Sequence, residues 1–387
     1  MNEYHYIGFD VHKKSIQFCA KQADGQIVAE GRIAATRLAL AEWVARQSHP
    51  WKGAMEATMF SAWIYDALAP HAAQLKVAHS AMLKAIAASK HASDRLDARK
   101  IADLVRMDWI PGVWMAPPEM RALRLQLRYR NLVVHQATQT KNRLASILME
   151  HGVEYSKSKL HGRQYFRNLL EGLEHVPEEV RNLLRYGRGS LEMFQTTQRL
   201  LLRGLDRDPR LAERVGLLRT IPGVGQVTAL TWALEIGDPR RFRSADRAVS
   251  YCGLVSPWQE SAGRSYRQPL SKKRNPHLQT VLIEAAHLVP RYHPGLCQLY
   301  DRVEQEQDAG AAVLAVARKL VCYLLAVDRS RQPFQVRTAP SSPSSPTPQT
   351  AGTPGPPMDH AQTAPQSSPS RVRRATASGA KATRRPG

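Results

Sequence analysis

The residues best placed to do chemistry are two aspartates in the run SDRLDARKIADLV, which spans residues 93–105. The apolar positions of this run follow a helical period, and Ser93 or Asp94 could cap the helix. Asp94 and Asp97 are then three residues apart on one helix face. Two carboxylates that close repel each other unless a cation lies between them, so the spacing indicates a hard divalent metal such as Mg²⁺. The structural alternative is a capped, solvated helix start.

Two further acids end strand-like runs. Asp10 ends YHYIGFD at residues 4–10, and Glu56 ends WKGAME at residues 51–56. Four carboxylates that hold two Mg²⁺ ions can activate an attacking oxygen and stabilise the leaving oxygen of a phosphodiester. An acid at a strand end is commonly a turn residue, so the prediction depends on the joint placement of all four.

The elements that must position these acids follow a recognisable order. Strands are expected at residues 4–10, 15–22, 26–33, 51–56 and 74–79, with an Asp24-Gly25 hairpin turn after the second. Helices are expected after a Thr36 cap, at 61–68, at 81–88 and from the paired aspartates onward. The order βββαβαβα is the ribonuclease-H-like arrangement, in which strand ends and one late helix bring distant carboxylates together.

Three short motifs in this region resemble one known family. The runs YIGFDVHKK, MEAT and SDRLDARKIADL closely resemble the N-terminal part of the DEDD-class insertion-sequence transposases. That family includes site-specific DNA invertases and bridge-RNA-guided recombinases. The resemblance implies a RuvC-like domain at residues 1–115, with Asp10, Glu56, Asp94 and Asp97 as its catalytic, Mg²⁺-binding acids.

Residues 116–205 predict long helices. Pro117-Pro118 suits the first turn of a helix, and a heptad seam follows from residue 120 to 148, interrupted by Arg130 and Lys141. The seam fits either a coiled coil that dimerises or an antiparallel hairpin within the chain. The basic face of this helix could follow nucleic-acid phosphates or simply be solvated.

A glycine turn opens the next domain, which we expect at residues 206–330 and mostly helical. The run LLRTIPGVGQVTAL at residues 217–230 resembles a helix-hairpin-helix, in which backbone N–H groups near Gly223 and Gly225 approach a phosphate. A packed corner between two helices is the alternative.

The same domain carries a second signature. The run YCGLVSPWQESAGRSYRQPLSKKRNPHL, residues 251–278, resembles the C-terminal motif of the same transposases, and the resemblance implies that Ser261 is a nucleophile. Four cations could neutralise the phosphate that it attacks: Arg264, Arg267, Lys272 and Lys273. A serine beside glycine is ordinarily a turn residue, and the basic turn departs from the family's glycine-containing form. Ser265 and Ser271 therefore stay open as alternatives.

Composition bounds the class of protein. The 387 residues carry 55 Lys and Arg against 33 Asp and Glu, a formal charge of +22, which indicates a polyanionic partner, with a merely basic protein as the alternative. No apolar run comes near the roughly 20 residues of a membrane span, no signal peptide is evident, and the four cysteines form no CxxC pair. We therefore expect a cytoplasmic protein without a membrane, zinc-knuckle or disulfide framework. Residues 331–387 are rich in Pro, Ser and Thr and end in basic residues, which predicts a disordered basic tail.

These observations predict a transposase or site-specific recombinase that moves its own DNA element. The acids would hold Mg²⁺ at the scissile phosphate while Ser261 attacks it. The expected partners are DNA at the element ends and target, a noncoding guide RNA that the resemblance implies, and further copies of the chain as a dimer or tetramer. Two alternatives remain: a hydrolytic RuvC-like nuclease such as a junction resolvase, and a non-catalytic nucleic-acid-binding protein.

Overall fold

The structure is a computed structural model that describes residues 4–86, 94–256, 258–261, 264–267 and 269–335. For residues 84–86, 94, 258–261 and 264–267 it describes the backbone alone. Ser93 and residues 336–387, most of the predicted tail, lie outside the described residues.

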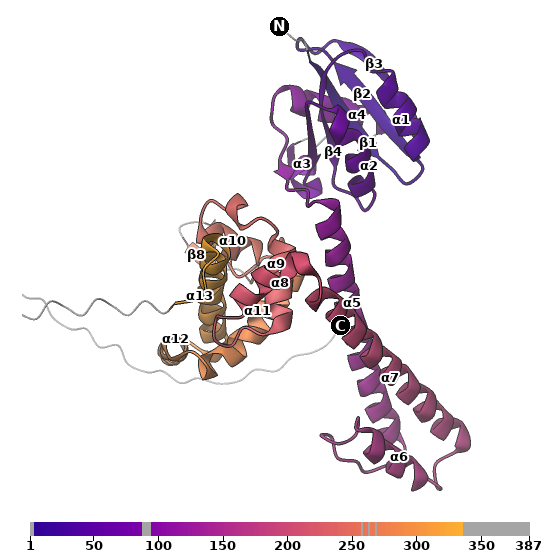
Figure 1. Cartoon of the computed structure of the whole chain (residues 1–387), viewed down its shortest axis with the longest axis vertical. Helices are drawn as coiled ribbons and strands as arrows, with labels where there is room; N and C mark the ends of the chain where they lie inside the picture. The colour runs from indigo at the N-terminus through magenta and orange to yellow at the C-terminus, as the bar shows by residue number, and fades with distance from the viewer. Residues whose placement is uncertain (1–3, 87–93, 257, 262–263, 268, 336–387) are drawn as a thin grey trace, which may run out of the picture. The chain divides into compact units, whose positions relative to one another are not determined.

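The N-terminal domain is built on a six-stranded sheet with the order β3-β2-β1-β4-β5-β6 (Figure 1). The strands are β1 (His5–Val11), β2 (Ser15–Lys21), β3 (Ile27–Ala34), β4 (Trp51–Glu56), β5 (Gln74–Ala78) and β6 (Gly112–Val113). Strands β1, β4 and β5 are parallel neighbours, whereas β2, β3 and β6 pair antiparallel. The order matches the predicted ribonuclease-H-like arrangement. Strand β6 was not predicted, because two residues are too few for an alternating pattern.

Helices cover both faces of this sheet. Helices α1 (Arg37–Ala45) and α2 (Ser61–Leu68) pack on one face, where their apolar residues meet Ile7, Phe9 and Met55. Helices α3 (Ser80–Ile86) and α4 (Asp94–Arg106) follow β5, with the short 3₁₀ turn η1 (Ala69–His71) between α2 and β5. Helix α4 packs on the opposite face through the small residues Ala98 and Ala102. Thr36 caps α1 as predicted, since its side chain accepts from Ala39 N.

Gly8 allows α4 to approach the sheet closely. A Cβ at this position would overlap the backbone oxygen of Ala98 and lie 2.9 Å from the Cβ of Ile101. Real Cβ atoms essentially never come that close to other heavy atoms, so residue 8 must lack a side chain. The absence of a side chain in β1 therefore decides how near the sheet α4 can lie.

Two long helices follow, α5 (Pro118–Glu150) and α7 (Glu178–Asp206), with α6 (Arg163–Glu171) between them. Gln126 Nε2 donates to Leu201 O at 3.0 Å, while Leu144 packs against Gly187. Early residues of α5 thus meet late residues of α7, so the two helices run antiparallel. The structure therefore contains the hairpin within one chain, and dimerisation through the heptad seam stays a prediction.

The C-terminal domain is mostly helical. It contains α8 (Pro209–Leu218), α9 (Gln226–Ile236), α10 (Ala245–Tyr251), α11 (Pro276–Leu288), α12 (Pro294–Glu306) and α13 (Ala309–Ser330), the 3₁₀ turns η2 (Pro239–Arg241) and η3 (Val289–Arg291), and a hairpin of β7 (Trp258–Ser261) and β8 (Arg264–Arg267). Helix α9 lies at its centre, with residues 228–236 all buried. Leu123 and Leu127 at the start of α5 belong to the same core.

Helix α13 corrects one prediction. It is long and apolar enough, by length and composition, to cross a membrane, although no such run was expected. Arg318 and Lys319 interrupt its apolar residues in the sequence, so no membrane span was expected there. Its buried residues, among them Val316, Leu320 and Leu324, belong to the core of the C-terminal domain. We therefore describe α13 as a core helix.

The folded chain extends a little past the expected start of the tail at residue 331. Phe334 packs against the rings of His293 and Tyr323, with centroid distances of 5.7 and 5.0 Å. Its backbone N donates to Thr220 Oγ1 at 2.8 Å. Residues 331–335 are therefore attached to the C-terminal domain rather than to the tail, because the one aromatic of the predicted tail has a site in the core.

Candidate active site

Asp10 and Glu56 end neighbouring parallel strands. Phe9 of β1 lies opposite Met55 of β4 in the register, so the next residues, Asp10 and Glu56, are also adjacent. Side chains alternate along a strand, and Phe9 and Met55 face α1 and α2. Asp10 and Glu56 therefore face α4. Asp10 is buried, at 9% exposed.

Ion pairs show which way α4 runs across the sheet. Lys21 Nζ pairs with Asp103 Oδ2 at 2.6 Å, and Lys21 lies opposite Tyr6 in β1. Four residues earlier in the helix, Arg99 forms a bidentate pair with Glu30, at 2.8 and 2.9 Å.

Glu30 lies opposite Cys19, which lies opposite Gly8. Along β1, Arg99 of α4 therefore lies beside Gly8, and Asp103, later in the helix, lies beside Tyr6. Helix α4 thus runs antiparallel to β1. Its first turn, with Asp94 and Asp97, lies about one helical turn beyond Gly8, at the edge where Asp10 ends its strand. The end of β1, the end of β4 and the start of α4 therefore share one edge, which we call the acid edge.

Charged neighbours surround the acid edge. His12 Nε2 lies 2.9 Å from Asp10 Oδ2, within hydrogen-bond distance. Lys100 Nζ donates to Asp97 Oδ1 at 3.0 Å. The partial positive charge of the α4 N-terminus also favours carboxylates there.

The donors of the acid edge suit a hard cation. Carboxylate oxygens are the ligands that Mg²⁺ prefers. Among the side chains that the structure describes, no three His, Cys, Asp or Glu residues are close enough to hold a metal ion. The side chain of Asp94 is not among them. The four-acid metal site therefore stays a prediction that the backbone arrangement permits.

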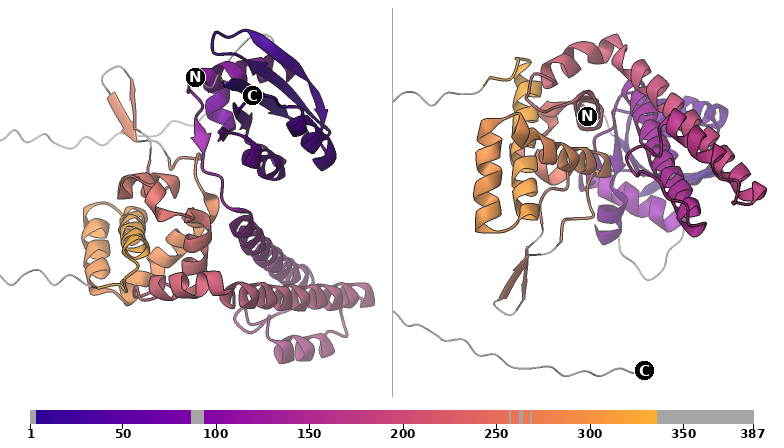
Figure 2. Two further views of the ribbon diagram at one scale, coloured as in Figure 1. Left: turned by 45° about the horizontal axis from the view of Figure 1, so that its top comes forward. Right: turned by 90° about the horizontal axis from the view of Figure 1, so that it is seen from below.

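Ser261 is the last residue of strand β7. In the hairpin register Ser261 lies opposite Arg264, and Trp258 lies opposite Arg267. The hairpin stands away from the helices of its domain in both views of Figure 2. The side chains of Ser261, Arg264 and Arg267 lie outside the described atoms. We call β7 and β8 the serine hairpin.

The residues after the serine hairpin form a tight basic turn. Lys272 and Lys273 are exposed. The Ser271 hydroxyl accepts from Lys273 N at 3.1 Å, so Ser271 has the role of a turn residue.

The predicted phosphate-binding turn joins α8 to α9. Gly223 has a φ of 81°, and a Cβ there would lie 2.9 Å from Val289 Cα, so this glycine serves packing. Gly225 is the N-cap of α9 and has no heavy atom within 4 Å of its Cβ position. The turn thus combines a packed corner with an open helix start. Phosphate binding by this turn stays a prediction.

A buried carboxylate that bonds to Asn275, a few residues after the serine hairpin, was not predicted. Glu235 of α9 is fully buried, and both of its oxygens accept from Arg128 at 2.8 Å. Asn275 Nδ2 donates to Glu235 Oε2, also at 2.8 Å. Burial alone would raise the pKa of Glu235, but the hydrogen bonds from Arg128 and Asn275 and the nearby guanidinium charges hold this pKa below its usual range. One signal in the sequence was available: a carboxylate inside the apolar run ALTWALEI requires a cationic partner.

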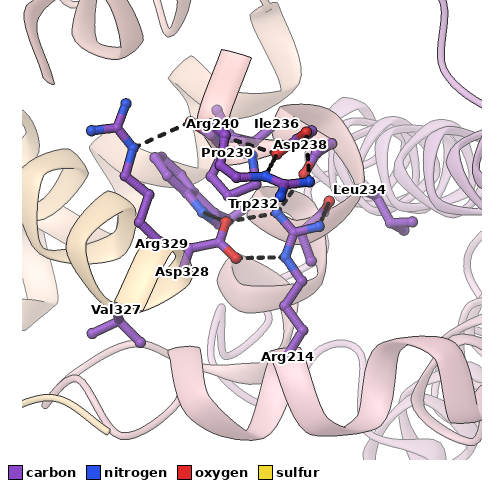
Figure 3. Close-up of polar contacts among 12 residues, drawn as sticks. Arg214, Trp232, Leu234, Ile236, Asp238, Pro239, Arg240, Val327, Asp328 and Arg329 are labelled. Carbon is purple, nitrogen blue, oxygen red and sulfur yellow. Dashed lines mark hydrogen bonds and ion pairs between the residues drawn. The ribbon is translucent and has the colours of Figure 1, made fainter. Parts of the chain in front are cut away.

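A second buried carboxylate of the same domain is shown in Figure 3. Asp328 accepts from Arg214 Nε and Nη2 at 2.7 and 2.6 Å, and from Trp232 Nε1 at 2.9 Å. Arg214 also donates to the carbonyl oxygens of Ala233 and Gly237 at the end of α9. This pair resembles Glu235–Arg128 in chemistry. Among the described residues, its hydrogen-bond partners are Trp232, Ala233 and Gly237, and none of these lies in the serine hairpin.

Comparison with known proteins supports both signatures. Residues 7–152, which include the acid edge, match the DEDD transposase domain of the IS110 type. Residues 215–301, which include the serine hairpin, match the transposase IS116/IS110/IS902 family. The chain belongs to the DEDD-class transposase family of the IS110 type.

Several relatives of this IS110-type chain carry descriptive names. It is 24% identical over 292 residues to the transposase for insertion sequence element IS1328 of Yersinia enterocolitica, covering 73% of this chain and 83% of that protein. It is 28% identical over 216 residues to the putative transposase y4qE of Sinorhizobium fredii, which is 55% of this chain and only 52% of the relative's length. It is 32% identical over 133 residues to the pilin gene-inverting protein of Moraxella bovis, covering 33% of this chain and 41% of that protein.

Proposed function

We propose that this IS110-type chain is a transposase that cuts and rejoins DNA at the ends of an insertion sequence and at its target. The observation that carries the proposal is the acid edge. The ends of β1 and β4 and the start of α4 are far apart in the sequence, yet they share one edge of the sheet. The structural alternative is that these acids are ordinary turn residues, and Gly8, which lets α4 lie against β1, is compatible with both interpretations.

The acids and the serine take different roles in this proposal. Asp10, Glu56, Asp94 and Asp97 would hold Mg²⁺, as two ions, which would stabilise the negative charge on the attacking and leaving oxygens. The Ser261 hydroxyl gives up its proton and attacks the phosphorus, so that a serine–phosphate ester forms while the bond to one sugar oxygen breaks. The freed sugar oxygen takes up a proton. Attack by another sugar hydroxyl on this ester then rejoins DNA and releases the serine.

Basic residues would hold the nucleic acid. Arg264, Arg267, Lys272 and Lys273 neutralise phosphates near the serine, and the turn at Gly223 and Gly225 offers backbone N–H groups to another phosphate. The formal charge of +22 suits DNA together with a noncoding guide RNA. The acid edge and the serine hairpin belong to separate segments, so we also propose that a dimer or tetramer assembles the complete centre. A reducing cytoplasm is the proposed compartment.

A cleavage assay on a denaturing gel tests this function. Labelled DNA with the element ends is incubated with protein, Mg²⁺ and the transcript that flanks the element. Wild type should convert the label into a protein-linked band, whereas Asp10→Asn and Ser261→Ala should each reduce this band by about 100-fold or more. Asp24→Asn, a change in the hairpin turn after β2, is the matched control and should leave the band unchanged.

Two outcomes contradict the proposal. Cleavage without a protein-linked band that also survives Ser261→Ala would mean a hydrolytic RuvC-like nuclease that uses water. The absence of Mg²⁺-dependent cleavage, with DNA binding intact, would mean a non-catalytic nucleic-acid-binding protein.

A further inference from the structure

The serine hairpin grows from a segment whose two ends are joined. Asn275 N donates to Tyr251 O at 3.0 Å, which connects the end of α10 to the start of α11. One step closer to the hairpin, Ser271 N donates to Val255 O at 3.4 Å. The hairpin therefore has a defined base, formed by residues 251–255 and 271–275.

The segment between α10 and the hairpin also bonds to two other helices, α11 and α13. Gln279 Nε2 donates to Gly253 O at 2.6 Å, and Arg318 Nε donates to Leu254 O at 2.8 Å. Gly253 has a φ of 73°, and a Cβ there would lie 2.5 Å from Arg274 Cβ. The chain thus leaves the domain in one direction, held by α11 and α13.

The bonds of this base meet at Glu235. The Asn275 side chain donates to Glu235 Oε2, and its Oδ1 accepts from His277 N and Leu278 N at the start of α11. The amide is therefore bonded at both ends and cannot rotate without losing a buried hydrogen bond. Tyr251 Oη also lies within hydrogen-bond distance of Glu235 O, at 3.4 Å.

Arg128 holds Glu235 from the other side. Its guanidinium gives two parallel bonds of 2.8 Å, the bidentate geometry that fixes both the distance and the plane of a carboxylate. Arg128 belongs to α5, so the long helix is linked through one carboxylate to the base of the serine hairpin. Glu235 is 0% exposed and cannot contact DNA, which leaves positioning as its way to act.

We propose that Glu235 and Arg128 are positioning residues that hold the base of the serine hairpin and so set the direction from which Ser261 approaches the phosphate. This inference rests on the proposed function. Loss of the pair lets the hairpin base move, and displacement of a nucleophile by about 1 Å can cost on the order of 100-fold in rate.

The Asp328–Arg214 pair supplies a matched control. Asp328 is also buried, also receives a bidentate arginine and one further N–H donor, and that donor is Trp232 of the same helix, α9. Glu235→Gln and Asp328→Asn both neutralise a buried carboxylate at nearly constant shape. Both should lower the unfolding temperature, whereas only Glu235→Gln should affect the hairpin.

Hydrogen exchange of the full-length protein tests the positioning role without DNA. We expect the backbone amides of β7, β8 and residues 269–275 to exchange about tenfold faster in Glu235→Gln than in wild type, and at the wild-type rate in Asp328→Asn. Arg128→Lys keeps the charge but offers no planar fork, so it should give an intermediate rate. This milder variant also serves if Glu235→Gln fails to fold.

The rate of serine–DNA ester formation in a single turnover is the second readout. At temperatures equally far below each unfolding midpoint, Glu235→Gln should be slower than Asp328→Asn by about 10- to 100-fold, with DNA affinity unchanged. Equal exchange rates in the hairpin of the two variants would overturn the positioning role. If wild type forms no ester, the proposed function fails, while unequal exchange would still support the link between Glu235 and the hairpin.

Discussion

At the scale of single residues, Gly8 has the least room for a side chain among the described glycines of the N-terminal domain. Its Cα faces the backbone of α4, and no side chain fits between them. The glycine lets α4 pack closely against β1, so a residue without chemistry of its own sets how near to the sheet this helix lies.

Gly8→Ala should therefore destabilise the domain. An added Cβ must push α4 away from β1, and overpacking of this kind costs about 3 kcal/mol. Chemical denaturation followed by circular dichroism measures the loss. Gly112→Ala in the same sheet is the control, because the nearest atom to its Cβ position is the Cδ of Lys76 at 3.9 Å. Equal stability of the two variants would show that α4 does not need the close approach.

Glu235 predicts a defined pH dependence. Its pKa is lowered in the folded protein, so its ionised form stabilises the fold at neutral pH, and this contribution fades as the pH falls below the ordinary glutamate pKa of about 4.3. Glu235→Gln cannot titrate. The difference in free energy of unfolding between wild type and Glu235→Gln should be about 2 kcal/mol at pH 7 and should shrink steadily below about pH 4.3.

Denaturation of both proteins at several pH values between 7 and 3 measures this difference. Other carboxylates titrate in both proteins and cancel in the comparison. A difference that stays constant down to pH 3 would contradict the ionised, hydrogen-bonded state of Glu235.

At the scale of elements, most of the N-terminal domain could be predicted. Strand β4 and helix α2 have the predicted bounds. The order of strands and helices along the chain predicted the ribonuclease-H-like arrangement that the sheet has. This succeeded because alternation in strands and capping at Thr36 are local properties. The resemblance, rather than the periodicity, pointed to Ser261, since a serine at the end of a short strand has no distinctive local pattern.

Other features depend on contacts that no local pattern reports. Glu235 and Arg128 are 107 residues apart, so their pairing could not be predicted from either helix alone. The sequence did not predict that α13 is long and apolar enough to cross a membrane, because Arg318 and Lys319 divide its apolar run; Arg318 in fact bonds to Leu254 O. The heptad seam predicted a long helix but did not decide between a partner in the same chain and one in another.

The turn between α8 and α9 makes a prediction at this scale. If N–H groups at the start of α9 hold a phosphate, Gly225→Asp should repel it and weaken DNA binding about fivefold, since charge effects at a helix terminus are of order 1 kcal/mol. Stability should hold or rise slightly, because Asp is a good N-cap and nothing lies within 4 Å of the Cβ position.

Fluorescence anisotropy with labelled duplex DNA at low salt measures this affinity. Gly225→Ser is the control, since it caps the helix without adding charge. Unchanged affinity in Gly225→Asp would assign the turn to packing alone.

At the scale of the whole molecule, the net charge indicates the class of partner, whereas the geometry of the two sites indicates the reaction. The excess of 22 positive charges favours any nucleic acid, and binding that depends on it should weaken with salt in every version of the function. The acid edge and the serine hairpin distinguish among the candidate functions, because together they predict a covalent bond between Ser261 and a DNA phosphate. The account therefore depends on which atom of the chain becomes attached to the phosphate.

The most direct measurement is to find that atom. Covalent protein–DNA product from wild type is digested with nuclease and protease, and the peptide that keeps a nucleotide is sequenced by mass spectrometry. The account predicts the nucleotide on Ser261. A nucleotide on Ser265 or Ser271 would contradict the assignment of the nucleophile, and cut DNA without any modified peptide would contradict the serine mechanism itself.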